Sequence, residues 1–331
     1  MPTEQAAWNE GDLLAWLADR YRPPHPGEGI GDDCALLICG EGFLAVTTDA
    51  VVEDVHFRRG WLSWAEIGSR AARGCLSDLA AVCAEPQGIF LSLGLPPDVS
   101  RQDAQAFVEG AAAAAGAYAA SLKGGDTVAS RVFFADVVGV GRVLGRPWLR
   151  SGGQEGDLLA VTGKLGGPAA AVALLEAGRS RESSQWPVLR SRFGHPTPRV
   201  REAIALADLD IHAAIDLSDG LMLDASRLAA ASNCRAVIEA TRLPVLDGVE
   251  EAAGLLGADP LVFVAAGGEE YELLLAIPKD QVEVAGERLE ALGCPLTVIG
   301  CLQAGSGAVL LGPGGRPIEL SVCGWLHGGR S

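Results

Sequence analysis

Positive charge is scarce in this sequence of 331 residues. Its 26 lysines and arginines stand against 42 aspartates and glutamates, which gives a formal net charge of −16 at pH 7. A chain with this charge repels nucleic-acid backbones and anionic membranes over a Debye length or more. The composition therefore argues against both as partners, and an anionic ligand such as a nucleotide would need bridging cations.

Two further features are absent. None of the eight cysteines forms a Cys-x-x-Cys pair, so we expect small buried side chains in a reducing compartment. No apolar run has the length of a membrane span, and the first residues, MPTEQAAWNEGD, are polar and acidic where a signal peptide would be basic and then apolar. We expect a soluble cytoplasmic protein.

The composition is that of an ordinary globular protein, with 49% hydrophobic and 21% charged residues, and the length suits two domains. A long strand predicted over 131–143 ends the first half. From Arg150 a loop, a strand, a glycine turn and a helix begin a second α/β unit. We therefore predict two α/β domains, at 1–147 and 148–331.

Polar side chains concentrate between residues 29 and 57, in GIGDDCALLICGEGFLAVTTDAVVEDVHF. Strands predicted over 36–38 and 43–46 would bring the carboxylates of this stretch to neighbouring strand ends. Converging carboxylates repel one another unless a hard cation neutralises them, and oxygen ligands suit Mg²⁺. The alternative is an acidic loop that is simply solvated. The side chains in question are Asp32, Asp33, Thr47, Thr48, Asp49 and His56.

Two motifs of the first half follow. Ser63 and Glu66 form a capping box for a helix predicted to end near residue 84, and Asp78 lies in an apolar turn of it, where burial is costly unless the carboxylate is paired or metal-bound. A second helix is predicted from Ser100 to about Leu122. The Lys123–Thr127 segment after it, KGGDT, either brings backbone amides to a phosphate or is an ordinary helix-to-strand turn.

The second half contains one strong motif. A strand predicted over 213–216 ends in Asp216, Ser218, Asp219 and a glycine before a helix, and loops at strand ends are where α/β proteins bind ligands. An N-cap accounts for one of these polar groups but not for all three. Further on, GGEEY precedes a strand, and residues 178–198 read as irregular.

Eight segments, in this order, resemble the thiamine-monophosphate kinase family, which belongs to the superfamily of aminoimidazole ribonucleotide synthetase. They are GIGDDCALL, TTDAVVEDVHF, LSDLAAV, SLGLP, GGDT, LRSGGQEGDLLAVTG, DLSDGL and GGEEYEL. Each motif is weak alone, whereas eight in register are specific. The resemblance implies phosphorylation of thiamine monophosphate to thiamine diphosphate with ATP and several Mg²⁺ ions, and a homodimer of two-domain chains paired through their N-terminal sheets.

The resemblance also assigns roles to residues. Gly125, Asp126, Arg150 and Ser218 match ATP contacts, His56, Glu269 and Trp325 match substrate contacts, and Asp126 and Asp219 are expected to be catalytic. The first domain would bind ATP and metal and the second would complete the site. The expected metal ligands are Asp33, Thr47, Thr48, Asp49, Asp78, Asp126, Asp216 and Asp219.

Three positions depart from the family pattern. Glu270 replaces an aspartate after GGE, Cys75 replaces an asparagine before LSD, and Asp54 replaces a glycine before VHF. Rival hypotheses are a cyclo-ligase or selenophosphate-forming reaction on the same scaffold, and a non-enzymatic metal-binding protein. The ligands are scattered over nearly 190 residues, whereas a simple binding module supplies them locally, so the enzyme is favoured.

Overall fold

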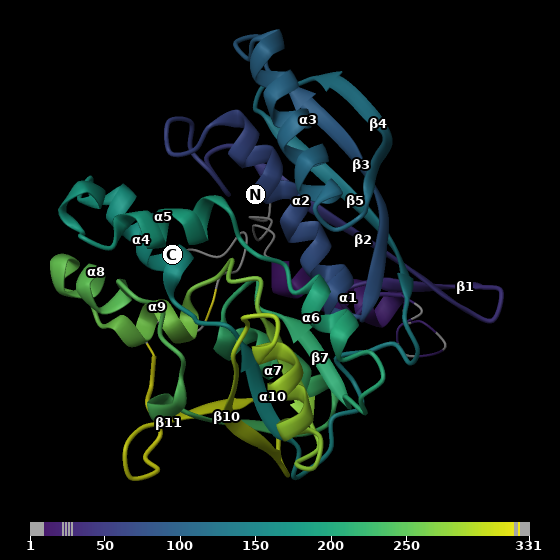
Figure 1. The fold of residues 1–331 in the computed structure, drawn as a ribbon, viewed down its shortest axis with the longest axis vertical. Coiled ribbons are helices and arrows are strands. Elements are labelled where there is room, and N and C mark those ends of the chain that lie inside the picture. Colours follow the sequence, from purple (N-terminus) through teal and green to yellow (C-terminus); the bar gives the residue numbers. More distant parts are fainter. Residues whose placement is uncertain are drawn as a thin grey trace, which may run out of the picture.

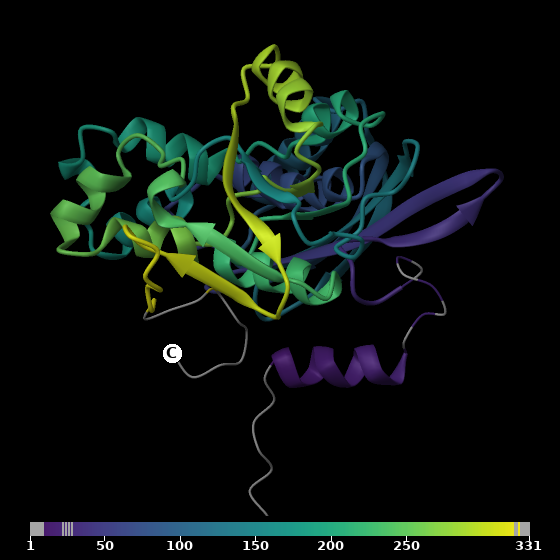
Figure 2. The ribbon, with the colours of Figure 1, turned by 90° about the horizontal axis from the view of Figure 1, so that it is seen from below.

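The computed structural model describes residues 10–21, 23, 25, 27, 29–320 and 324. The elements of its first half are α1 (Glu10–Arg20), β1 (Ala35–Cys39), β2 (Gly42–Val52), α2 (Trp64–Ala81), β3 (Ala84–Leu95), α3 (Arg101–Gly116), β4 (Ser121–Ala129) and β5 (Phe134–Val143). This half holds one sheet, with α2 and α3 packed against it (Figure 1), while α1 stands apart from the body (Figure 2).

The first sheet has the strand order β1-β2-β5-β3-β4, with β4 at one edge and parallel to β3. Alternate side chains of β3, such as Ile89 and Leu91, are buried on the face that α2 and α3 cover. The other face, which we call the open face, is not covered by any helix of the described residues, and Phe90 and Val128 are exposed there. The β1–β2 hairpin extends from the body as an arm (Figure 2).

Helix α2 lies between the two halves of the molecule. Its N-terminus has the predicted capping box, in which Ser63 and Glu66 satisfy each other's backbone amides. Most of its residues are small or apolar and buried, and it packs against β2 and β5 on one side and against β7 (Ala213–Asp216) and α6 (Val200–Ala205) on the other. A helix buried on both sides can present polar side chains to residues of both halves.

The second sheet has six strands in the order β11-β8-β10-β6-β9-β7, and β7 is an edge strand. Helices α4, α5, α8 and α9 cluster beside it (Figure 1). The remaining elements are β6 (Leu158–Thr162), α4 (Gly167–Glu176), η1 (Ser180–Glu182), α5 (Trp186–Gly194), α7 (Leu221–Ala231), β8 (Arg235–Glu239), η2 (Ala240–Arg242), α8 (Val249–Leu256), α9 (Pro260–Ala266), β9 (Leu273–Ile277), α10 (Val282–Glu290), β10 (Leu296–Gln303) and β11 (Ala308–Leu311).

Several sequence expectations about these elements are wrong. The alanine-rich helix ends at Gly116, because the chain turns at Ala119 with φ 59°, and 121–129 is a strand. The KGGDT segment therefore lies within a strand and is not a helix-to-strand turn. Asp49 lies inside β2 and not at its end. Residues 186–194, expected to be irregular, form α5, which buries Leu189 and Phe193. No helix in the described ranges is long and apolar enough to cross a membrane.

Candidate active site

Three carboxylates from distant parts of the chain meet beside α2. Oxygen atoms of Asp33, Asp78 and Asp216 all lie within 4.8 Å of one another. Asp33 precedes β1, Asp78 stands in the last turn of α2, and Asp216 ends β7, so both sheets contribute to what we call the carboxylate cluster. Polar residues from both halves gather at the α2 surface that packs between them.

Hydroxyl groups and one guanidinium partly compensate the cluster. Thr47 Oγ1 donates to Asp78 Oδ2 at 2.6 Å, and Ser77 Oγ donates to Asp216 Oδ2 at 2.7 Å. Arg150 Nη2 lies 2.5 Å from Asp33 Oδ1, while Asp33 Oδ2 is buried and has no hydrogen-bond partner in the structure. One cation for three carboxylates leaves an excess of negative charge, and the unpartnered oxygen is free to bind a ligand.

The electrostatics of the cluster favour a cation. Burial raises the pKa of Asp78 well above its usual range, and Asp216 and Asp49 raise it further. The pKa of Asp216 is also raised, mainly by burial and to a smaller extent by the charge of Asp33. Carboxyl groups held together this way take up protons unless a metal ion replaces the protons. Oxygen donors of this kind suit Mg²⁺.

The Asp216–Asp219 loop is fixed by a residue that sequence reasoning missed. Asp224, fully buried in α7, accepts hydrogen bonds from the backbone amides of Asp219 and Gly220, each at 3.1 Å. Arg227 forms ion pairs with both Asp219 and Asp224. The sequence did offer a signal for this role. Asp224 is a carboxylate in the first turn of the helix that follows the DLSDG motif, where the backbone amides at the start of a helix lack partners within the helix.

A second charged group lies further along α2. Arg70 is 2% exposed and forms an ion pair with Glu269. Asp49 on β2 is close by, and its pKa is raised to about 7 by burial and by Glu269, while Arg70 acts in the opposite direction. A Cβ on Gly74 would lie 2.3 Å from Asp49 Oδ2 and 3.2 Å from the Tyr271 hydroxyl. The side chains of Asp49 and Tyr271 can therefore lie this close to the α2 backbone only because residue 74 is glycine.

Two expected ligands lie on the other side of the first sheet. Asp126, Ser92, Asp136 and Ala50 form one cross-strand row from β4 to β2, on the open face. Three strand spacings of about 4.8 Å place the Asp126 backbone roughly 14 Å from β2. Thr48 alternates with Thr47 and is exposed on the same open face. One chain therefore does not bring Asp126 or Thr48 to the carboxylate cluster.

The other expected residues occupy varied places. Gly125 lies in β4 at φ 153°, where a Cβ would meet the Leu91 carbonyl oxygen at 1.8 Å, so packing by itself requires a glycine. Ser218 is partly buried next to Asp219. His56 Nδ1 accepts a hydrogen bond from the Val52 amide at 3.0 Å. Trp325 lies outside the described residues.

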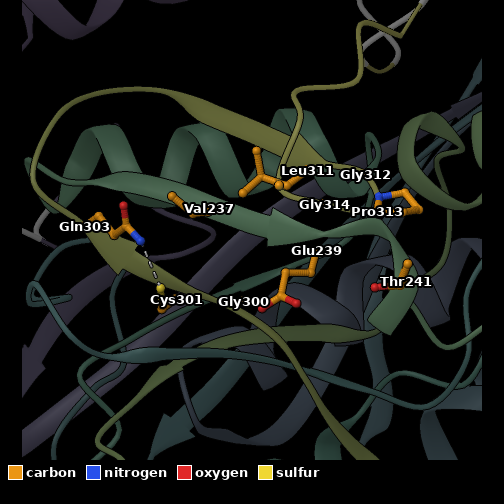
Figure 3. A pocket seen from close by; sticks show the side chains of 11 residues that line it. Val237, Glu239, Thr241, Gly300, Cys301, Gln303, Leu311, Gly312, Pro313 and Gly314 are labelled. Atoms are coloured by element: carbon orange, nitrogen blue, oxygen red, sulfur yellow. Dashed lines mark hydrogen bonds between the residues drawn. The ribbon is translucent and has the colours of Figure 1, made fainter.

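A different pocket lies at the far edge of the second sheet (Figure 3). Side chains of β8 and β10, among them Glu239 and Cys301, line it together with the 311–315 turn, and its volume is about 280 Å³. It borders β11 and β8, whereas Asp216 is on β7 at the opposite edge. The carboxylate cluster, and not this pocket, is therefore the candidate active site.

Comparison with known proteins identifies the family of this chain. Residues 31–143 match the family model for the N-terminal domain of AIR synthase related protein, and residues 154–312 match the model for its C-terminal domain. The chain is 36% identical over 275 residues to a thiamine-monophosphate kinase of Mycobacterium tuberculosis, which covers 82% of this chain and 81% of the relative. This chain belongs to the thiamine-monophosphate kinase family.

Other members of the thiamine-monophosphate kinase family match over nearly the whole chain. The protein of Pyrococcus abyssi is 32% identical to this chain over 320 residues, and the match covers 96% of this chain and 95% of the Pyrococcus protein. A solved structure described as AaThiL complexed with AMPPCP and TMP superposes with a TM-score of 0.85 at 28% identity, covering 96% of this chain and 97% of that one. The resemblance carried by the eight motifs and the predicted α/β fold are both confirmed.

Proposed function

We propose that this chain transfers the γ-phosphoryl group of ATP directly to thiamine monophosphate, forming thiamine diphosphate. Its family membership supports the reaction, and so does a relative solved with AMPPCP and TMP. The observation that carries the proposal is the convergence of Asp33, Asp78 and Asp216 from both halves of the chain. Phosphoryl transfer is catalysed mainly by positioning and by compensation of charge, which this cluster can provide.

The donor set of the carboxylate cluster fits Mg²⁺. Its three carboxylates, from Asp33, Asp78 and Asp216, supply oxygen atoms, which are hard ligands. One of these atoms, Asp33 Oδ2, has no hydrogen-bond partner in the structure. Bound Mg²⁺ would neutralise phosphate oxygens and charge that develops as the phosphoryl group moves. Asp219, on the same loop as Asp216, would bind or orient the same group, and Arg150 would meet the nucleotide's phosphates from beside Asp33.

The acceptor needs little activation by the protein. A phosphate monoester has a second pKa near 6, so the phosphate oxygen that attacks is ionised at neutral pH and needs no general base. The chain's task is to hold that oxygen in line with the γ-phosphorus. Glu269, with His56 and Trp325, is proposed to hold the thiamine end. The Glu269 side chain is 29% exposed, so it can accept a hydrogen bond or face a cation.

We further propose domains at 1–147 and 148–331, and a homodimer through the open face of the first sheet. The protomer leaves apolar side chains uncovered on or beside that face, on β1, β3 and β4: Leu37, Ile38, Phe90 and Val128. Asp126 and Thr48 also lie on the open face, away from the carboxylate cluster of the same chain. Pairing of open faces would bury this surface and let Asp126 of one chain act in the nucleotide site of its partner.

Mixing two inactive variants tests this arrangement. Asp78→Asn and Asp126→Asn chains, unfolded and refolded together, would form hybrids with one intact site if Asp126 acts across the interface. Recovery of activity on mixing supports the homodimer and the shared site. Activity that stays at the level of the separate variants, although sedimentation shows that hybrids form, would mean that Asp126 acts within its own chain or has another role.

The reaction itself is tested by its products. Incubation with ATP, Mg²⁺ and thiamine monophosphate should give thiamine diphosphate and ADP, which phosphorus NMR distinguishes from inorganic phosphate. A cyclo-ligase would release phosphate instead. Direct transfer also predicts that label does not exchange between ADP and ATP in the absence of the acceptor, whereas exchange would indicate a phosphoenzyme. We place the enzyme in the cytoplasm, in keeping with the free thiols of the cysteines in the described ranges.

A further inference from the structure

One face of α2 lines the site from end to end. Arg70, Gly74, Ser77 and Asp78 recur at helical spacing, so they point to the same side. Asp78 and Ser77 reach the carboxylate cluster, Gly74 makes room for Asp49, and Arg70 lies two turns from Asp78, about 12 Å along the helix axis. The α2 face thus joins the metal end of the site to the Glu269 end.

Arg70 connects three segments that are far apart in the sequence. Its Nη2 pairs with the Glu269 carboxylate, and its Nη1 donates to the Phe193 carbonyl oxygen at 3.0 Å. Its guanidinium carbon also lies 4.4 Å from the centroid of the Phe193 ring. A planar guanidinium can make all these contacts at once because its donors are fixed in one plane and its faces can stack. The two Phe193 contacts restrict the orientation of Arg70 and set its guanidinium against the Glu269 carboxylate.

The loop that carries Glu269 needs such a restraint. Glu269 has φ 65° and Tyr271 has φ 53°, both in the left-handed region that side chains of this size rarely adopt. Their amides donate to the carbonyl oxygens of Ser218 at 2.7 Å and Leu217 at 2.9 Å. Those bonds fix the backbone next to the Asp216–Asp219 loop, whereas Arg70 fixes the side chain. Strain of this kind is kept where a site depends on it.

We propose that Arg70 is a positioning residue for the acceptor substrate, holding the Glu269 carboxylate toward the thiamine moiety. This inference rests on the proposed function. The thiamine moiety is a cation with an amino-bearing ring, and one oxygen of a partly exposed, immobilised carboxylate is suited to contact it. Without Arg70 the Glu269 side chain takes other rotamers, and the acceptor has to restrict them when it binds. The nucleotide end, two turns away, is unaffected.

Arg73 offers a matched control on the same helix. Its Nη1 donates to the Pro196 carbonyl oxygen at 2.8 Å and its Nε to Ser69 Oγ at 3.1 Å, so it links α2 to the chain just after α5, whereas Arg70 contacts Phe193 within α5. No contact joins it to Glu269. If Arg70 served only to hold the two halves together, then Arg73→Met and Arg70→Met would have similar effects on kinetics and on thermal stability.

The test is steady-state kinetics with each substrate varied in turn. Arg70→Met should raise the KM for thiamine monophosphate at least tenfold and leave the KM for ATP within twofold, while Arg73→Met leaves both within twofold. Arg70→Lys should fall between wild type and Arg70→Met, because an ammonium can pair with Glu269 but cannot also hold Phe193 in the same way. Arg70→Met with Glu269→Gln removes both charges, so it provides a folded variant if the single change is unstable.

The possible outcomes separate this inference from the proposed function. Three results would each overturn the positioning role. The first is an equal increase in both KM values for Arg70→Met, and the second is an unchanged KM for thiamine monophosphate in a folded Arg70→Met or double variant. The third is the same increase in the KM for thiamine monophosphate in Arg73→Met. Wild-type enzyme that forms no thiamine diphosphate would instead overturn the proposed function.

Discussion

Asp49→Asn should stabilise the metal-free protein and abolish its activity. Asp49 lies on β2 beside Gly74 and Tyr271, and its pKa is raised to about 7 by burial and by Glu269, against the effect of Arg70. An asparagine of nearly the same shape removes the charge that the folded state disfavours. The same change removes an expected metal ligand, so turnover should fall by orders of magnitude.

The size of the stabilisation follows from the pKa. A carboxyl group whose pKa rises from 3.8 to about 7 on folding costs the folded state about 4 kcal/mol at pH 8 when both states are ionised. The residue is partly exposed, so solvent screening reduces this to about 2 kcal/mol. Because the folded-state pKa is raised, stability is lost as pH rises from about 4 to about 7. At pH 4.5 the same calculation gives only about 0.5 kcal/mol.

Thermal and urea unfolding in EDTA at the two pH values would measure the difference. The variant should melt a few degrees above wild type at pH 8 and nearly with it at pH 4.5. Glu109→Gln is the control, because Glu109 is exposed on α3, away from the open face, and its change should alter metal-free stability by less than about 0.5 kcal/mol at either pH. Equal stabilisation at both pH values, or none at pH 8, would refute the electrostatic account of this site.

Three further predictions concern the wild type, the nucleotide site and a buried ion pair. Mg²⁺ should raise the thermal midpoint of the wild type more at pH 8 than at pH 5, because protons compete for the carboxylates at low pH, and equal shifts would contradict a carboxylate site. In Asp216→Ala with Asp219→Ala, the stabilisation by AMPPCP and Mg²⁺ should shrink strongly; an undiminished shift in matched melting curves would show that the first half binds nucleotide alone. Arg199→Met should lower the free energy of unfolding by about 3 kcal/mol, because fully buried Glu272 would keep only Arg192 as its cationic partner. Urea titrations measure this loss, and a loss below about 1 kcal/mol would contradict the prediction.

Local signals in the sequence identified much of the site. The capping box at Ser63 and Glu66 begins α2, and the strand with the DLSDG motif is β7 followed by α7. Such features depend on neighbours within a few residues, so they can be read without the fold. Polar residues at strand ends and inside an apolar helix turn pointed to Asp33, Asp78 and Asp216, which the fold brings together.

Other features depend on contacts that no local pattern specifies. The alanine-rich run after Ser100 has the propensity to continue as a helix, yet pairing with β3 turns residues 121–129 into an edge strand. That pairing places Asp126 on the open face, far from its own cluster. No local pattern distinguishes Arg70 from the other residues of α2, and only the fold sets it against Glu269, nearly 200 residues later. The local sequence determines many of the helices and strands and shows where charge is unusual. The packing of α2 between the two sheets decides which charges meet, because that packing depends on the shape of every surface in contact with the helix.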